Sequence, residues 1–197
     1  MKLPVFKMKI NPDDTSAQAV EYVALVDQPA IETNWIAFDK QYSFSADSER
    51  RLVMGALMIA DMPIYRKGRI PNTDTEGEYY VVFQKDTIYE IVDKFFRNGY
   101  TSNFNINHDS NKRTTDVYMI ESFIVDSTRG VVPPKAFEGI SEGSWIATVK
   151  INNDEIWNDF VKTGKLKGFS VEGLFQPEYI NTEDEKLLQT IADMTKP

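Results

Sequence analysis

Short strand-like runs, separated by turn signals, constrain the fold of this chain more than any other feature of its sequence. Runs rich in β-branched and aromatic residues recur along most of the chain and are typical of β-strands. The clearest of them are 20–26, 51–60, 78–83, 103–108, 116–125, 144–151 and 168–175. Only a few segments have helical periodicity. This order predicts an α+β domain built on an antiparallel β-sheet or a small barrel, with two or three flanking helices.

The best helix is predicted at 86–98, where Asp86 can cap the N-terminus and Asn98-Gly99 can stop the helix. Its apolar residues fall on one stripe. They are Ile88, Ile91, Val92, Phe95 and Phe96. A second, short helix is predicted at 153–163, with Gly164 at its end.

Length and charge exclude several classes of protein. The 197 residues are enough for one domain with a substantial core, which we assign to 1–178, followed by a C-terminal helical tail at 179–197. A net charge of -8 argues against binding to nucleic acid or to an anionic membrane surface. Without cysteine there is no disulfide framework, zinc-thiolate site or cysteine nucleophile. The sequence has no apolar run of membrane-spanning length and no signal peptide, so the expected location is the cytoplasm.

Ser170 stands in a strand-like run between Gly168 and Gly173, and strand alternation puts Glu172 on the same face as Ser170. Such a serine is either a nucleophile presented on a rigid element or a small polar residue on a half-exposed strand. A serine hydroxyl needs an adjacent base to become a nucleophile. His108 is the single histidine of the chain, so it is the only imidazole available to Ser170.

The surroundings of His108 leave two interpretations open. It ends the run 103–108, and we expect the run 116–125 to pair antiparallel with that run. A histidine at this place is either a catalytic base or an imidazole at the edge of the core, bonded to a backbone carbonyl.

Several phrases of the sequence together resemble the prohead (capsid maturation) serine proteases of tailed bacteriophages. They are Asn-Ile-Asn-His-Asp at 105–109, Ile-Glu-Ser-Phe-Ile-Val at 120–125, Gly-Ser-Trp at 143–145 and Gly-Phe-Ser-Val-Glu-Gly at 168–173. The similarity covers most of residues 20–176 and is to the branch of phage-element serine proteases. That family is related in fold to the herpesvirus assembly protease, assemblin, so the resemblance implies an assemblin-like fold.

The resemblance implies that Ser170 is the nucleophile and His108 the general base. In the family, the third member lies on a strand after the serine. The matching phrase stands near the N-terminus of this chain instead, at 22–30, which resembles a circular permutation. The aligned position holds Tyr22, and Glu21 sits one place off, where a bulge would turn it toward the histidine.

Glu21 is therefore the first choice for the third member, with Glu172 and then Glu121 as runners-up. Replacement of the acid by Tyr22, or the use of another orienting group, also stays open. If the runs 103–108 and 116–125 form a simple hairpin, Glu121 lies several residues along the strand from His108 and is out of reach of the imidazole.

The resemblance further implies a serine endopeptidase that cleaves segments of phage scaffold and major capsid proteins, and also itself. The expected place is inside the immature phage head in the host cytoplasm, and no metal or other cofactor is required. An alternative is a catalytically silent protein with the protease fold that serves in head assembly, because the departure at the acid position also fits lost activity. A third is an unrelated binding module that uses the loop at 126–143.

Overall fold

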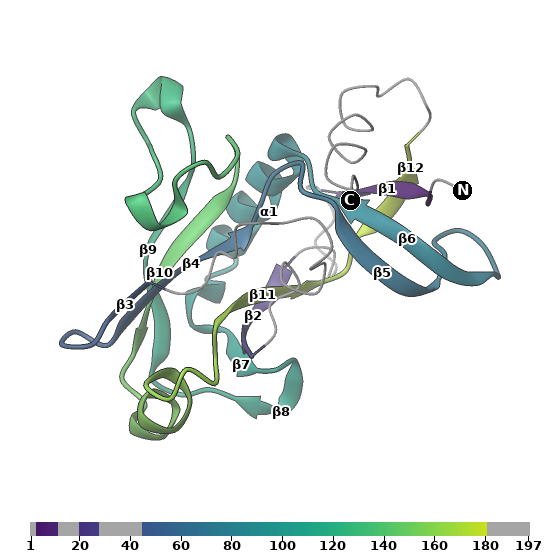
Figure 1. Cartoon of the computed structure of the whole chain (residues 1–197). Coiled ribbons are helices and arrows are strands. Elements are labelled where there is room, and N and C mark those ends of the chain that lie inside the picture. Colours follow the sequence, from purple (N-terminus) through teal and green to yellow (C-terminus); the bar gives the residue numbers. More distant parts are fainter. Residues whose placement is uncertain (1–2, 12–19, 28–44, 181–197) are drawn as a thin grey trace, which may run out of the picture.

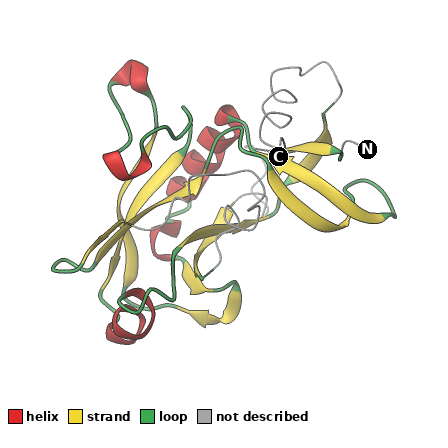
Figure 2. Cartoon of the chain, viewed as in Figure 1, coloured by secondary structure: helices red, strands yellow, loops and turns green. Residues whose placement is uncertain are grey.

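Three four-stranded sheets form the framework of the molecule (Figures 1 and 2). The structure, a computed structural model, describes residues 3–11, 20–27 and 45–180. Within these ranges the order of elements confirms the predicted α+β class. The predicted small barrel is wrong, because the sheets of the described residues are not closed into a barrel.

The first sheet has the order β12-β1-β6-β5, with β1 and β6 parallel and the other pairs antiparallel. Its strands are β12 (Gln176–Tyr179), β1 (Val5–Lys9), β6 (Glu76–Val82) and β5 (Ile64–Arg69). The helical tail is predicted at 179–197. Its first residue, Tyr179, is instead the last residue of β12, and everything after Ile180 lies outside the described residues.

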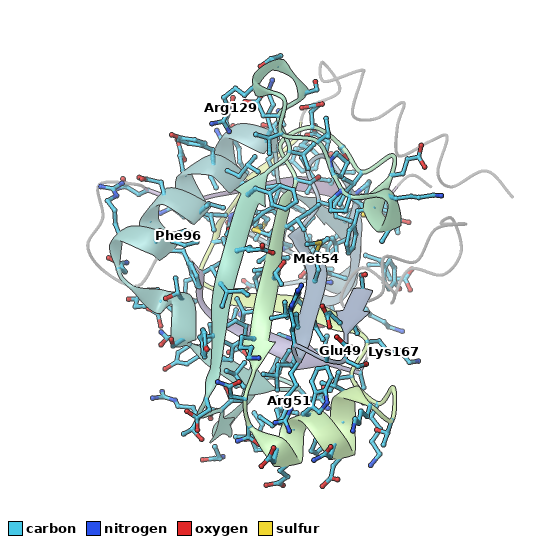
Figure 3. All side chains as sticks on the ribbon, turned by 90° about the vertical axis from the view of Figure 1, so that its left-hand side faces the viewer. Glu49, Arg51, Met54, Phe96, Arg129 and Lys167 are labelled. Carbon is cyan, nitrogen blue, oxygen red and sulfur yellow. The ribbon has the colours of Figure 1, made fainter. Side chains whose placement is uncertain are left out.

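The second sheet is antiparallel throughout, with the order β3-β4-β10-β9. Its strands are β3 (Ser45–Asp47), β4 (Leu52–Met58), β10 (Trp145–Ile151) and β9 (Val117–Ile124). In Figure 3 this sheet faces the viewer, with the labelled Met54 on it.

The third sheet has the order β11-β2-β7-β8, and its strands, together with the turn between β7 and β8, carry every residue predicted for the catalytic pair or its neighbourhood except Glu121. Its strands are β11 (Gly168–Gly173), β2 (Val20–Val26), β7 (Phe104–Ile106) and β8 (Asp109–Arg113). β2 runs antiparallel to β11 and parallel to β7.

The predicted hairpin between the runs 103–108 and 116–125 is wrong. β7 ends at Ile106 and pairs with β8, whereas β9 pairs with β10 in the second sheet. The reason is the turn at Asn107 and His108, which have φ of 51° and 59°. Positive φ at both central residues is the geometry of a two-residue β-hairpin turn, so the chain reverses two residues earlier than its apolar pattern indicates.

Helix α1 (Lys85–Arg97) confirms the predicted helix, with Gln84 rather than Asp86 at the N-cap. Ile88, Ile91 and Phe95 are fully buried, and the Phe95 ring packs edge-on to Trp145 at 5.3 Å between centroids. Phe96, labelled in Figure 3, is 42% exposed, because the next residue in a helix is turned about 100° around the axis. The predicted stripe is therefore right except for Phe96.

The predicted helix at 153–163 appears as η4 (Ile156–Val161), a π-helix that buries Ile156 and Trp157. The other helical segments described are short 3-10 turns: η1 (Tyr100–Ser102), η2 (Ser127–Arg129) and η3 (Lys135–Phe137). None of the helices in the described part of the chain has the length and apolar character needed to span a membrane.

The main hydrophobic core joins α1 and η4 to the second and third sheets. β10 is buried on both faces: Trp145, Ala147 and Val149 belong to this core. Ile146 packs on the opposite side, in a smaller cluster with Phe137. This core holds β11, β2 and β7 in register through Phe169, Leu25 and Phe104, and so fixes the strands that carry the candidate site.

Candidate active site

Ser170 lies on β11, which is an edge strand of the third sheet. It pairs with Ala24 of β2, which in turn pairs with Asn105 of β7, so one row crosses three strands. The Ser170 residue is 8% exposed. Glu172 follows two residues later, at a Cα separation of about 6.6 Å on the same face. The sheet thus presents a hydroxyl and a carboxylate side by side.

His108 reaches this face from the tip of the turn between β7 and β8. The turn is tied to β2, because the Asn107 N–H donates to the Leu25 carbonyl at 3.0 Å and the Asp27 N–H donates to Asn107 Oδ1 at 3.1 Å. From this position Nδ1 of His108 lies 2.8 Å from Oε1 of Glu172. The two side chains are 44% and 30% exposed.

Asn105 contributes to the same cluster from within the sheet. Its Nδ2 donates to Oε1 of Glu172 at 2.6 Å, so a single carboxylate oxygen contacts both Asn105 and His108. Asn105 is 2% exposed, and its Oδ1 is buried without a hydrogen-bond partner. Sequence reasoning missed Asn105, although its position in the run before His108, alternating with Phe104 and Ile106, placed it on the polar face of that run.

The structure brings His108 together with Glu172, and it places Ser170 two residues from Glu172 on one face. Among the described residues no hydrogen bond joins Ser170 to His108. Catalytic hydrogen bonds are often long or poorly aligned in a free enzyme and tighten when substrate binds. The arrangement therefore brings a hydroxyl, an imidazole and a carboxylate to one face, with the imidazole and the carboxylate in contact.

Glu21, the first choice for the third member, does not contact His108 in the described part of the chain. The expected bulge does occur, because Glu172 pairs with Tyr22 and Gly173 pairs with Val20. Glu21 is left as the extra residue, and its backbone carbonyl accepts a hydrogen bond from Asn103 Nδ2 at 3.0 Å. Its carboxylate does not replace Glu172 at the histidine.

The other candidates for the third member are also placed elsewhere. Glu121 lies on β9 in the second sheet, opposite Thr148. The Tyr22 ring packs under the Arg113 guanidinium, 5.0 Å from its centroid. Asp109, next to the histidine, is engaged within β8, where the Asn111 N–H and the Lys112 ammonium hold the pKa of that carboxyl below its usual value.

A cavity of about 430 Å³ opens beside Ser170, which forms part of its wall. One side is β11 from Phe169 to Gly173, and the other side comes from the end of β4 and from β5 and β6. Most of the lining is apolar, and Arg66 is its single cation among the described residues. Burial lowers the pKa of the Arg66 guanidinium. Sequence reasoning missed this cavity, because it forms between strands far apart in the chain.

No set of three or more histidine, aspartate or glutamate side chains in the described ranges gathers in a way that would hold a metal ion.

Comparison with known proteins finds a match to a family model. The family described as "Putative phage serine protease XkdF" matches residues 41–180, which include His108, Ser170 and Glu172. The match begins after β2 and does not include the N-terminal phrase at 22–30, so the circular permutation stays a prediction. No curated protein and no solved structure matches the chain. Because the family match covers well over half of the sequence, the chain belongs to the family described as putative phage serine protease XkdF.

Proposed function

We propose that the chain is a serine endopeptidase in which Ser170 is the nucleophile, His108 the general base and Glu172 the group that orients the base. The observation that carries the proposal is the 2.8 Å contact between His108 Nδ1 and Glu172 Oε1, on the strand that also bears Ser170. The family match supports the reaction class.

The contact with Glu172 determines which nitrogen of His108 acts. A carboxylate accepts a hydrogen bond, so it selects the tautomer with the proton on Nδ1 and leaves the lone pair on Nε2. Nε2 then takes the proton of Ser170 as Oγ attacks the scissile carbonyl and forms an acyl-enzyme. The protonated imidazole, stabilised by Glu172, gives its proton to the leaving amine. Water then attacks the acyl carbonyl while Nε2 takes its proton, and that proton passes to Ser170 Oγ as the ester bond breaks and the acid product leaves.

His108 must reach Ser170 for this step. It lies at a turn tip, and its side chain is 44% exposed, so its ring has room to reorient when a peptide fills the neighbouring cavity. Since Glu172 is on the same face as Ser170, the imidazole can keep its bond to the acid while Nε2 turns toward the hydroxyl.

We propose phage scaffold and major capsid proteins, and the enzyme itself, as substrates, cleaved inside the immature head in the host cytoplasm. This part rests on the resemblance to prohead proteases and on the description of the family as a phage protease.

A second candidate is a catalytically silent protein with the same fold that serves in head assembly. The absence of a hydrogen bond between Ser170 and His108 among the described residues favours it. The two candidates differ in one property, the reactivity of the Ser170 hydroxyl.

A fluorophosphonate probe measures that reactivity. We expect the purified protein to gain one covalent adduct, which peptide mapping assigns to Ser170. Ser170→Ala abolishes the adduct, and His108→Ala slows its formation by several orders of magnitude, since loss of the histidine in another serine protease costs about a million-fold in turnover. Ser127→Ala, which removes an exposed hydroxyl in η2, is the matched control and leaves labelling unchanged.

Incubation with the phage's scaffold and major capsid proteins then tests the substrates, with cleavage followed by gel and mass spectrometry. If the folded wild-type protein forms no adduct, the silent candidate holds and the endopeptidase is refuted. If an adduct forms at Ser170 but neither head protein is cut, the reaction class stands and the proposed substrates are wrong.

A further inference from the structure

Arg66 is the feature of the cavity that the proposed mechanism does not use. It lies on β5 and pairs with Tyr79 of β6, and both residues line the cavity together with Ser170. Its Nη1 donates to the Tyr65 carbonyl at 3.0 Å. A guanidinium has five N–H donors, so most of its hydrogen-bonding capacity remains for another group.

No carboxylate forms a salt bridge with Arg66 in the described part of the chain, whereas the other arginines on β5 and α1 have acidic partners. Arg69 pairs with Asp74, and Arg97 pairs with Asp93. Arg66 is also partly buried, whereas those two arginine side chains are 67% and 64% exposed. A partly buried charge without a counter-charge is costly, so its presence beside a cavity indicates that a ligand supplies the counter-charge.

The rest of the lining indicates what kind of group carries that charge. Met58, Met62, Ile64 and Val81 form an apolar wall that accommodates methylene groups. Among the described residues, Glu172 is the one acidic residue of the wall, and its Oε1 is already engaged by His108 and Asn105. The cavity thus combines an apolar body with one available cation, which fits the stem and head of a glutamate side chain.

We propose that this cavity is the specificity pocket of the enzyme and that Arg66 selects peptide substrates with an acidic side chain, glutamate above all, next to the bond that Ser170 attacks. The assignment of the pocket to a scissile bond rests on the proposed function, but the recognition of the carboxylate rests on Arg66 and the cavity. Arginine is suited to this role because its planar fork binds a carboxylate through two parallel hydrogen bonds.

The test separates binding from cleavage by using the Ser170→Ala protein. The probes are fluorescein-labelled hexapeptides of alanine and leucine with amidated C-termini. One glutamate is placed at each position in turn, and a matched peptide has glutamine there. Fluorescence anisotropy gives the two dissociation constants. We expect glutamate to bind about tenfold more tightly than glutamine at one position, as for one charge-assisted hydrogen-bonded pair.

Substitutions on β5 provide the controls. In the Ser170→Ala background, Arg66→Gln is expected to remove the preference for glutamate. Arg66→Lys keeps the charge but not the fork, so it retains only part of the preference. Lys67→Gln is the matched control: it removes one positive charge from the same strand, but this residue is exposed and is not part of the cavity wall. It is expected to keep the full preference.

Each outcome decides between the two proposals. Equal binding of all glutamate and glutamine pairs, or an unchanged preference in Arg66→Gln, refutes the role of Arg66. A preference that Lys67→Gln also removes assigns it to general surface charge and refutes the pocket. If only a second set of the same peptides, made with free C-terminal carboxylates, binds more tightly, side-chain recognition is refuted. A glutamate preference that depends on Arg66, in a wild-type protein that no fluorophosphonate labels, supports the pocket and refutes the endopeptidase.

Discussion

Replacing Glu172 by glutamine tests the proposed orientation of the base. In the native protein Oε1 accepts from His108 Nδ1 at 2.8 Å and from Asn105 Nδ2 at 2.6 Å. Glutamine keeps the size of the side chain and one acceptor oxygen but removes the negative charge that stabilises an imidazolium. A hydrogen bond to a charged group contributes about 1.5–3 kcal/mol. Since the side chains of His108 and Glu172 are 44% and 30% exposed, water screens the contact and the lower part of that range applies.

A loss of about 1.5–2 kcal/mol in the transition state corresponds to a rate that is about 10- to 30-fold slower. That is far less than the roughly 10⁴-fold effect of neutralising the buried aspartate of a Ser-His-Asp triad. The assay is the second-order rate constant for fluorophosphonate labelling of Ser170, measured by intact mass at neutral pH. It needs no knowledge of the natural substrate.

Glu21→Gln and Glu121→Gln are the controls, and both are expected to label at the wild-type rate, because neither carboxylate contacts the histidine among the described residues. A wild-type rate in Glu172→Gln together with a slow rate in Glu21→Gln would refute the assignment and restore Glu21 as the acid. A loss near 10⁴-fold would refute the argument from exposure.

Three further changes test other parts of the structure. Asn105→Leu removes the amide and its unpartnered Oδ1 together, so we expect labelling to slow about three- to tenfold at nearly unchanged stability, measured by thermal unfolding. Gly143→Ala puts a Cβ 2.2 Å from Lys85 Cβ, at a residue whose φ is +83°. The steric clash and the backbone strain of an alanine at positive φ add, so urea unfolding should show a loss of about 2–4 kcal/mol in the free energy of unfolding. The Thr128 hydroxyl and Arg129 hold the pKa of Asp126 below its usual value. The resulting stabilisation of the folded protein is present above the pKa of Asp126 in the unfolded chain, and it is lost as the pH falls through the pKa of Asp126 in the folded protein. Thr128→Val removes the hydroxyl that donates to this carboxylate, so an NMR titration should give a higher pKa for Asp126.

The local parts of the fold were predictable because they depend on neighbours in the sequence. The spacing of Ile88, Ile91 and Phe95 predicted α1, and Asn98 with Gly99 predicted its end, where Gly99 has φ of 70°. β8 was not predictable in the same way. It is an exposed edge strand, so it has no buried face and shows none of the apolar alternation that marks a strand.

Strand pairing was not predictable from these patterns, because a strand's own sequence does not name its partner. The apolar run of β2 is compatible with any buried position in a sheet. Nothing in that run indicates that β2 pairs with β11 on one side and runs parallel to β7 on the other. The turn at Asn107 and His108 could have been suspected, since asparagine and histidine are among the residues that tolerate positive φ. With that turn in place, the pairing of β7 with β9 is no longer expected.

The candidate site was predictable to the extent that its residues lie on one strand. Alternation along β11 put Glu172 on the face of Ser170, and that argument led to the residue that contacts the histidine. The higher rank of Glu21 came from aligning an N-terminal phrase with a strand that follows the serine in the family. An alignment identifies a position along the chain. Contact with His108 depends instead on which carboxylate side chain extends across β2 toward the turn that carries the histidine.

The order of the third sheet explains why the site needs a long acid and a histidine at a turn. β2 separates the serine strand from the strand before the histidine, so the backbones of β11 and β7 lie about 9.6 Å apart, twice the spacing of paired strands. A serine side chain is too short to cross that gap. Glu172 extends from one side, and His108 returns from beyond the end of β7, so that the two meet over β2. The small side chain of Ala24, between Ser170 and Asn105, leaves this space open. A bulky residue there would occupy the path of the imidazole toward Ser170, and the packing of this one central position is therefore part of the catalytic arrangement that we propose.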